Sequence, residues 1–373
     1  MAMAKGISTH GDVLVSETAD GVDLNSIWQE VQQVLELYNA ERTGIANLLS
    51  YRTVNVADAI PQSISSDSFE EATEVGVPRA IRPPSDVLKL GYSFKDYDIA
   101  LRASWKFLRE ATAEQVQAQV TRVIEADNKL TNGTVLNRLF NPQTQLNEWG
   151  HTVFGLYNAD GMVPPPYLGQ TFDGTHTHYL VSGSTVIDSQ DIEEILKHVI
   201  HHGYGTPSGA TMLILANPLD VEAATMTAWR AGVPYRESGP LPKWDFIPSA
   251  LMPAWISDET VHGPVPKSEI FGLQCWGSYG GALLIQSNYV PKGYVAVVAT
   301  GGPNSDANPV GFREHINPNY AGLRHIPGHW VGYPLQDSFF ARGFGVGTRH
   351  RGAAVVCQIT TNASYAAPTT IAT

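Results

Sequence analysis

The sequence predicts an α+β fold, because segments with a helical period and segments with a strand period both occur along its 373 residues. Residues 24–38 repeat apolar side chains every three or four positions, residues 97–105 alternate apolar and polar side chains, and residues 211–224 join a buried-strand pattern to a helix-start signal. With 43% hydrophobic residues, the chain is long enough to bury the core of one large domain or two ordinary ones.

The first element expected is an amphipathic helix within a polar N-terminal segment. Its apolar positions are Leu24, Ile27, Trp28, Val31, Val34, Leu35 and Tyr38. One face of such a helix has to be covered, so we expect this segment to be an arm that docks on another surface.

Residues 51–92 predict a long, extended, hairpin-like excursion. Strand-like runs, YRTVNVADAI and SDVLKLGY, stand at its two ends, and the polar stretch between them is interrupted by Pro61, Pro78, Pro83 and Pro84. A stretch this polar and open cannot form a core of its own, so we expect it to lie on another surface.

A half-buried strand and the longest helix of the chain come next. One side of the strand carries Tyr97, Ile99, Leu101, Ala103 and Trp105. Thr112 and Gln115 match the capping box that starts a helix, and the pair Asn132-Gly133 favours its end because both residue types tolerate positive φ. The apolar stripe of this helix is Val116, Val120, Val123, Ile124 and Leu130.

The second half of the chain predicts a further helix and several buried strands. Residues 188–203 have a helical period, with Asp188 or Ser189 as the cap and Gly203 as the stop. Asn217, followed by a proline, caps a short helix after the apolar run TMLILA. Further strands are expected in FGLQCW, ALLIQS, GYVAVVAT and the closing run DSFFARGFGVGTRHRGAAVVCQIT.

Charge and cysteine content argue against several classes of protein. The chain has 24 basic and 36 acidic residues and a formal net charge of -12, so a nucleic-acid reader that holds phosphates through a basic surface is not expected. Cys275 and Cys357 match no zinc or redox spacing and favour a reducing compartment. The first residues lack the apolar run of a signal peptide, and no later stretch has the length of a membrane helix, so no membrane association is expected.

Three histidines in the run EEILKHVIHHGYG, residues 193–205, raise the question of a metal site. His198 and His202 lie one turn apart on a helix and could share an ion. However, Val199 stands where a zinc protease of this pattern carries its glutamate base, and a third ligand would have to come from elsewhere, for example His176 or His178, which nothing in the spacing demands.

The sequence favours solvated imidazoles over metal ligands at these positions. His198, His201 and His202 fall in the last turns of the helix, where the carbonyl end of the helix dipole attracts positive charge. His176 and His178 alternate as surface residues of a strand do. No metal ligand and no cofactor is therefore expected.

The chain shows no catalytic motif. The glycine run GFGVGTRHRG, residues 343–352, is superficially similar to a phosphate-binding loop, but no helix pattern follows it, and a tightly packed strand is expected instead. The sequence also has no nucleophile elbow, P-loop or paired acid and base motif, so no enzymatic activity and no catalytic residue is expected.

The order of these segments resembles the major capsid proteins of tailed bacteriophages, which share the Hong Kong 97-type fold with encapsulin shells. The resemblance lies in LGYSFKDYDIALRASWKFLREATAEQVQAQVTRVIEADNKLTNG, in ATMLILANPLDVEAA and in FARGFGVGTRHRGAAVVCQI. It extends over nearly the whole chain as a helical arm, a polar excursion, a strand, a long helix and a closing pair of strands.

The resemblance implies four parts. Residues 1–52 resemble the N-terminal arm, and residues 53–93 resemble the extended loop that lies over a neighbouring subunit. Residues 94–209 together with 333–373 are similar to the peripheral domain with its long spine helix. Residues 210–332 are similar to the axial domain, which meets its copies around the axes of hexamers and pentamers.

A protein of this kind self-assembles into the hexamers and pentamers of an icosahedral phage head that encloses double-stranded DNA. The resemblance therefore implies a place in the virion capsid, assembly in the cytoplasm of the bacterial host, and packaged DNA held without sequence-specific binding. An acidic inner wall would keep that DNA mobile. Two alternatives stay open: an encapsulin-like compartment with protein cargo, and a metalloprotein built around the histidines.

Contacts between subunits are expected in the polar excursion. The residues expected to make them are Phe69, Glu70, Glu71, Glu74, Arg79 and Arg82. The type member of the family cross-links its shell through a lysine in this loop and a distant asparagine. Here the excursion holds Lys89 alone, near its base, so no covalent mesh is expected. The chain also lacks the long N-terminal segment that serves some relatives as a fused scaffold, so the expected partners are a separate scaffolding protein, a portal and a decoration protein.

Overall fold

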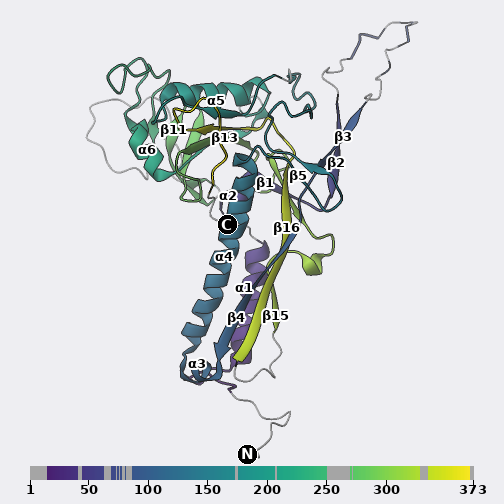
Figure 1. Ribbon diagram of the computed structural model, residues 1–373, viewed down its shortest axis with the longest axis vertical. Helices are drawn as coiled ribbons and strands as arrows, with labels where there is room; N and C mark the ends of the chain where they lie inside the picture. The colour runs from purple at the N-terminus through teal and green to yellow at the C-terminus, as the bar shows by residue number, and fades with distance from the viewer. Residues whose placement is uncertain are drawn as a thin grey trace, which may run out of the picture. The chain divides into compact units, whose positions relative to one another are not determined.

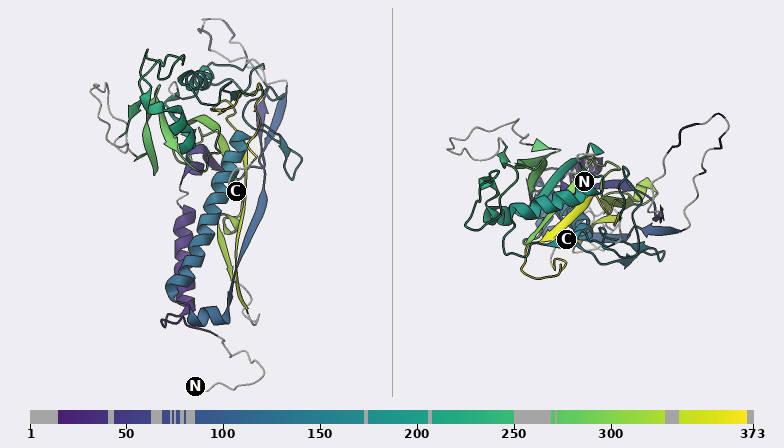
Figure 2. Two further views of the ribbon diagram at one scale, coloured as in Figure 1. Left: turned by 60° about the vertical axis from the view of Figure 1, so that its left-hand side comes forward. Right: turned by 90° about the horizontal axis from the view of Figure 1, so that it is seen from above.

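The computed structural model describes two compact units (Figures 1 and 2). Unit 1 comprises Met1–Arg42, Lys95–Leu130 and His315–Phe344, and unit 2 comprises Thr43–Phe94, Thr131–Glu314 and Gly345–Thr373. Both contain helices and strands, which confirms the predicted α+β class. The residues that the structure describes are 15–40, 44–62, 69–72, 74, 76–77, 80, 86–172, 175–205, 208–249, 269–270, 272–327 and 335–369.

Unit 1 combines an antiparallel ladder with helices. β4 (Lys95–Ser104) pairs along its whole length with β16 (Leu335–Thr348), and β15 (Arg324–Pro327) also pairs with β16. The predicted strand is thus confirmed, although Ile99 is 43% exposed and Trp105 begins a helix. The helical elements are α1 (Leu24–Ala40), α3 (Trp105–Glu110), most of α4 (Ala113–Phe140) and a short 3-10 turn (Pro318–Tyr320).

The core of unit 1 lies between α1 and α4, which run side by side in Figures 1 and 2. Apolar residues three or four positions apart share one face of a helix, and most of both predicted stripes is buried here, although Val34 is 47% exposed. The arm helix therefore docks within its own unit. The buried members of this core are Val15, Leu24, Ile27, Val31, Leu35, Ala103, Leu108, Ala111, Val116, Val120, Val123, Leu323 and Phe340.

α4 begins as the sequence predicts and ends later than predicted. Thr112 and Gln115 exchange hydrogen bonds between side chain and backbone, which confirms the capping box. The predicted end at Asn132-Gly133 is wrong, since the helix continues to Phe140. Its last turns carry Val135, Leu136, Leu139 and Phe140, all 0% exposed, and the burial of these side chains outweighs the weak helix propensity of glycine.

Unit 2 is built on a sheet of eight strands in the order β10-β11-β12-β8-β13-β17-β7, with β9 paired to β11. β8 is central, parallel to β12 and antiparallel to β13, whose residues are all buried. Cys275 in β11 and Cys357 in β17 are buried free thiols. The bounds are β7 (Tyr179–Val181), β8 (Thr211–Ala216), β9 (Ile247–Pro248), β10 (Glu269–Ile270), β11 (Leu273–Tyr279), β12 (Ala282–Gln286), β13 (Tyr294–Thr300) and β17 (Ala354–Gln358).

Two capped helices complete the core of unit 2. α5 (Ser189–His201) begins at Asp188 and buries its apolar face against β13 and β17. α6 (Pro218–Ala224) begins at Asn217, whose side chain accepts a hydrogen bond from the backbone N–H of Leu219 (3.1 Å), and a 3-10 turn (Met226–Ala228) follows it. Both predicted caps are therefore confirmed.

The remaining elements of unit 2 are short. α2 (Ile45–Leu49) leads into β1 (Ser50–Thr53), which pairs in parallel with β14 (Val310–Glu314). β2 (Ala57–Pro61) pairs with β3 (Val87–Gly91), and β5 (Gln145–Leu146) pairs with β6 (Thr152–Val153).

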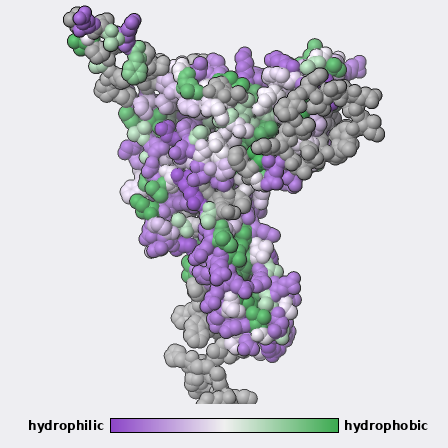
Figure 3. Space-filling model, turned by 180° about the vertical axis from the view of Figure 1, so that it is seen from behind, coloured by the Kyte–Doolittle hydropathy of each residue, from purple (hydrophilic) through white to green (hydrophobic). Residues whose placement is uncertain are grey.

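Figure 3 shows polar and apolar residues interspersed over one face of the molecule. Among the described residues, none of the helices combines the length and the apolar character that crossing a bilayer requires.

Candidate functional site

The predicted excursion begins as a two-stranded antiparallel ribbon. Five residue pairs join β2 and β3, from Ala57 opposite Gly91 to Pro61 opposite Val87, which confirms its hairpin-like start. Ile60 and Leu90 are buried in a small cluster with Tyr92, Phe154 and Met162. Val87 and Leu88 are 50% and 39% exposed, so the ribbon presents apolar side chains that its own unit does not cover.

A buried polar network fixes the base of this ribbon. The Tyr92 hydroxyl donates to Oδ2 of Asp58 (2.6 Å), and Nε of Arg349 lies 3.2 Å from the same oxygen. Burial raises the pKa of Tyr51 to about 12 and raises the pKa of Tyr92 further, so both phenols keep their protons. Since Tyr92 gives its proton to Asp58, the 2.8 Å bond between the two hydroxyls is donated by Tyr51.

Asn147 holds the two ends of the ribbon together. Its Nδ2 donates to the carbonyls of Val56 (3.1 Å) and Tyr92 (3.2 Å), and its Oδ1 accepts from the backbone N–H of His151 (2.8 Å). Local sequence signals do not identify this network, because apart from Asn147 and His151 its partners lie at least 34 residues apart in the chain. The ribbon therefore extends from a base that these hydrogen bonds hold rigid.

The residues expected to contact other subunits lie beyond the ribbon. Phe69 is fully exposed, at 106%, and Glu70, Glu71 and Glu74 are exposed as well. Arg79 and Arg82 lie outside the described residues. The structure contains one chain, so these contacts stay a prediction.

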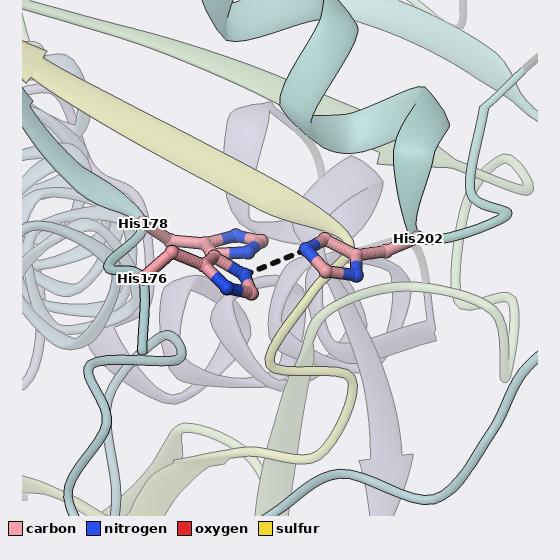
Figure 4. A group of neighbouring side chains, drawn as sticks. All are labelled: His176, His178 and His202. Atoms are coloured by element: carbon pink, nitrogen blue, oxygen red, sulfur yellow. Dashed lines mark hydrogen bonds between the residues drawn. The ribbon is translucent and has the colours of Figure 1, made fainter. Parts of the chain in front are cut away.

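The histidines form a cluster that their spacing along α5 does not predict. His176 and His178 lie just before β7, and His202 follows α5, yet a ring nitrogen of each lies within 4.8 Å of the others (Figure 4). Nε2 of His176 and Nε2 of His202 are hydrogen bonded at 2.7 Å. His198, the expected partner of His202, instead contacts the carbonyl of Glu194 through Nδ1 (3.2 Å).

The expectation of solvated imidazoles is wrong for two of these residues. His178 is 0% exposed and His202 is 1% exposed, whereas His201 is exposed as expected. α5 ends at His201, and Gly203 adopts a φ of +82°, so His202 belongs to the turn and not to the polar flank of the helix. The ring of His202 stacks on Phe172, with centroids 3.9 Å apart. Phe172 and His176 lie 26 or more residues before His202 in the chain, so no local sequence pattern predicts that they contact it.

A cavity of about 500 Å³ opens beside this cluster. His176 lines it together with polar and charged side chains of α5 and with Lys243. At its wall, Glu193 is 6% exposed and accepts hydrogen bonds from the hydroxyl of Tyr279 (2.7 Å) and the backbone N–H of Lys243 (2.8 Å). These partners satisfy the carboxylate of Glu193, which is therefore part of the framework and not a free acid.

Comparison with known proteins gives a strong similarity to a solved phage structure. No protein-family model matches the chain, and no curated protein sequence matches it. A solved structure from Mycobacterium phage Patience is 36% identical over 98% of this chain and 96% of that chain, with a TM-score of 0.70. The mature capsid of bacteriophage PhiM1 (9% identity, 86% and 88% coverage, TM-score 0.49) and an encapsulin from Synechococcus elongatus (14% identity, 90% and 97% coverage, TM-score 0.45) are more distant.

The identity to the Patience chain extends over nearly the whole length of both proteins, so it includes both units, the ribbon and the closing strands. The α+β architecture agrees with it. This chain therefore belongs to the major capsid proteins of tailed bacteriophages, which have the Hong Kong 97-type fold.

Proposed function

We propose that this capsid protein assembles into the hexamers and pentamers of an icosahedral phage head that encloses double-stranded DNA. The observation that supports this most directly is the β2–β3 ribbon, which has a rigid buried base and exposed apolar side chains toward its tip. An apolar surface that one subunit leaves exposed can be buried against identical neighbouring subunits in a closed assembly.

The four-part division belongs to this proposal. Residues 53–93 act as the extended loop over a neighbour, and residues 1–52 act as the arm. Residues 94–209 with 333–373 form the peripheral domain, and residues 210–332 form the axial domain. The 28 residues of α4 and the ribbon agree with a spine helix and an extended loop.

The packaged DNA is held without sequence-specific contacts. A net charge of -12 gives no net attraction for phosphates, so the polymer stays mobile inside the shell. Assembly takes place in the cytoplasm of the bacterial host, with a scaffolding protein, a portal and a decoration protein as further partners. No catalytic role is proposed for any residue.

The test replaces residues 63–85 by Asn-Gly, which closes β2 and β3 with a two-residue turn and keeps the backbone bond from Gln62 to Asp86 (2.9 Å). The shortened chain should keep the far-ultraviolet circular dichroism spectrum and melting temperature of the wild type, and electron microscopy should show no shells. A shortened chain that still forms shells, or one that unfolds, would contradict the proposal.

Matched point variants sharpen this test. Phe69→Ala removes an exposed apolar side chain from the loop, and Leu146→Ala removes one that is 72% exposed at the end of β5. Only Phe69→Ala should lower the yield of shells. Nuclease-protected DNA in purified particles distinguishes a phage head from an encapsulin-like compartment, which would contain a packaged protein instead.

A further inference from the structure

We infer that His176, His178 and His202 form a binding site for one divalent transition-metal ion, and that zinc is the ion the site fits best. Three imidazole nitrogens on a tetrahedral ion are a common ligand set for zinc, with a fourth position left to water. This site is separate from the β2–β3 ribbon that supports the proposed assembly, because its residues lie just before β7 and just after α5.

The spacing of the three rings suits a shared ion. Rings that bind one tetrahedral zinc through nitrogens about 2.0–2.1 Å away have centroids about 5 Å apart. Here the centroids of His176 and His202 are 4.7 Å apart, those of His178 and His202 are 5.0 Å apart, and those of His176 and His178 are 5.4 Å apart. Figure 4 shows His176 and His178 side by side, with His202 facing them.

One pair of atoms has to separate when the ion binds. Nε2 of His176 and Nε2 of His202 are 2.7 Å apart as hydrogen-bond partners, whereas two nitrogens on tetrahedral zinc lie about 3.3 Å apart. Small rotations of the two side chains supply this difference, and two metal bonds then replace one hydrogen bond. His176 is half-buried, so its ring has room to move.

His178 is already in the state that a ligand needs. Its Nδ1 lies 2.7 Å from the carbonyl of Ala354, and a carbonyl only accepts, so Nδ1 carries the proton and Nε2 keeps its lone pair. Nε2 is buried and has no hydrogen-bond partner among the described residues. Burial lowers the pKa of His178 well below its usual value, which keeps the ring neutral.

The surroundings resemble those of structural metal sites. A backbone carbonyl that orients the far nitrogen of a ligating histidine is a common feature of such sites. Phe172 stacks flat on His202, and the Tyr157 ring lies 5.0 Å from that of His176, so aromatic rings shield the cluster. His176 also borders the cavity beside α5, which gives an ion a route from solvent.

His198 is outside the proposed ligand set. Its ring centroid lies 6.3 Å from that of His176 and 6.5 Å from that of His178, which is longer than a shared ion allows, and its Nδ1 contacts the carbonyl of Glu194. The ion therefore ties the segment before β7 to the turn after α5.

The test measures metal on the full-length protein, per chain and without regard to shells. Protein stripped with a chelator is titrated with Zn²⁺ and with Co²⁺, and retained metal is counted by mass spectrometry after dialysis. The wild type should retain one Zn²⁺ per chain and give the visible absorption of tetrahedral Co²⁺. The melting temperature should rise with Zn²⁺, because an ion that binds the folded chain stabilises it.

His176→Ala is the informative variant, because its half-buried side chain can be removed with less damage than that of His178. It should weaken Zn²⁺ binding by at least about 100-fold, since even the loss of an outer partner of a ligand weakens affinity by about 10–100-fold. His201→Ala, an exposed neighbour outside the cluster, is the matched control and should bind Zn²⁺ as the wild type does.

Three results would contradict the proposed metal site. In the first, the wild type retains neither Zn²⁺ nor Co²⁺ at about one ion per chain. His176→Ala could bind Zn²⁺ as tightly as the wild type. His201→Ala could lose as much affinity as His176→Ala, which would place the metal on the surface histidines. Because metal is counted per chain, a failure of shell assembly would not change the interpretation of these metal-binding measurements.

Discussion

A single arginine organises the loop that precedes the histidine cluster. Arg351 is 1% exposed, and its guanidinium donates to the carbonyls of Gly155 (2.9 Å), Met162 (2.8 Å) and Leu156 (3.1 Å) and pairs with Asp160. Five donors in one rigid plane suit several carbonyls at once, which a lysine could not do. The loop at residues 155–162 is therefore tied to the turn between β16 and β17.

Replacing Arg351 by methionine should lower the free energy of unfolding of unit 2 by about 3–5 kcal/mol, because the carbonyls and Asp160 lose their partner while the volume is largely kept. Arg52→Met is the control, since Arg52 is 39% exposed and lies 3.6 Å from Glu314. It should cost at most about 1 kcal/mol. Denaturant unfolding of both variants measures the difference, and equal costs would contradict this role for Arg351.

Residue patterns in the sequence predict which segments pack tightly better than they predict which residues contact each other. The glycine run at 343–352 predicts a tightly packed strand, which is confirmed as far as Thr348, where β16 ends and a turn begins: a Cβ on Gly345 would lie 1.8 Å from the carbonyl oxygen of Ser93. The histidine cluster is different. His176 and His202 meet across 26 residues of chain, so spacing within EEILKHVIHHGYG points to His198 as the partner and misses His176.

At the scale of elements, the helix starts and the end of α5 at Gly203 are predicted well, and the end of α4 is not. Thr112, Asp188 and Asn217 all begin helices as expected, because a cap is a local hydrogen bond that residue type decides. The end of α4 depends on burial of its last turns by residues remote in sequence, including α2, whose Ala46 N–H donates to Asn132 (2.9 Å). No local pattern around Asn132-Gly133 contains that information.

The capping box of α5 makes the stability of unit 2 depend on pH. Asp191 accepts a hydrogen bond from the backbone N–H of Asp188 (2.8 Å), and burial raises the pKa of Asp191 from 3.8 to about 6. The folded chain therefore binds this proton more tightly than the unfolded chain does. Its contribution to stability is complete below pH 3.8 and is lost as the pH rises to about 6.

Asp191→Asn tests this sign, because asparagine keeps the acceptor for the N–H of Asp188 and cannot titrate. The free energy of unfolding of the wild type, relative to that of the variant, should fall as the pH rises from 3.8 to about 6 and be flat above that range. Denaturant unfolding at a series of pH values measures it. A difference that rises with pH, or does not change, would contradict the raised pKa.

At the scale of the whole molecule, the order of elements is visible in the sequence and their grouping is not. Unit 1 is assembled from three separate segments of the chain, and α4 and β16 each contribute to both units. Contacts between remote segments decide such a grouping, and hydrophobic periodicity describes only one segment at a time. The succession of elements is nevertheless enough to show the resemblance that the 36% identity then confirms.

The net charge leads to a prediction about assembly. Each chain has a formal charge of -12, so bringing many copies into one shell works against their mutual repulsion. Salt screens such repulsion over about 10 Å at 0.1 M, so raising the salt concentration should lower the protein concentration at which shells form. Light scattering follows the assembly, and sodium and choline chlorides should act equally if screening is the cause. Slower assembly in salt would instead mean that ion pairs between subunits, such as those expected for Glu70, Glu71 and Glu74, dominate the contacts.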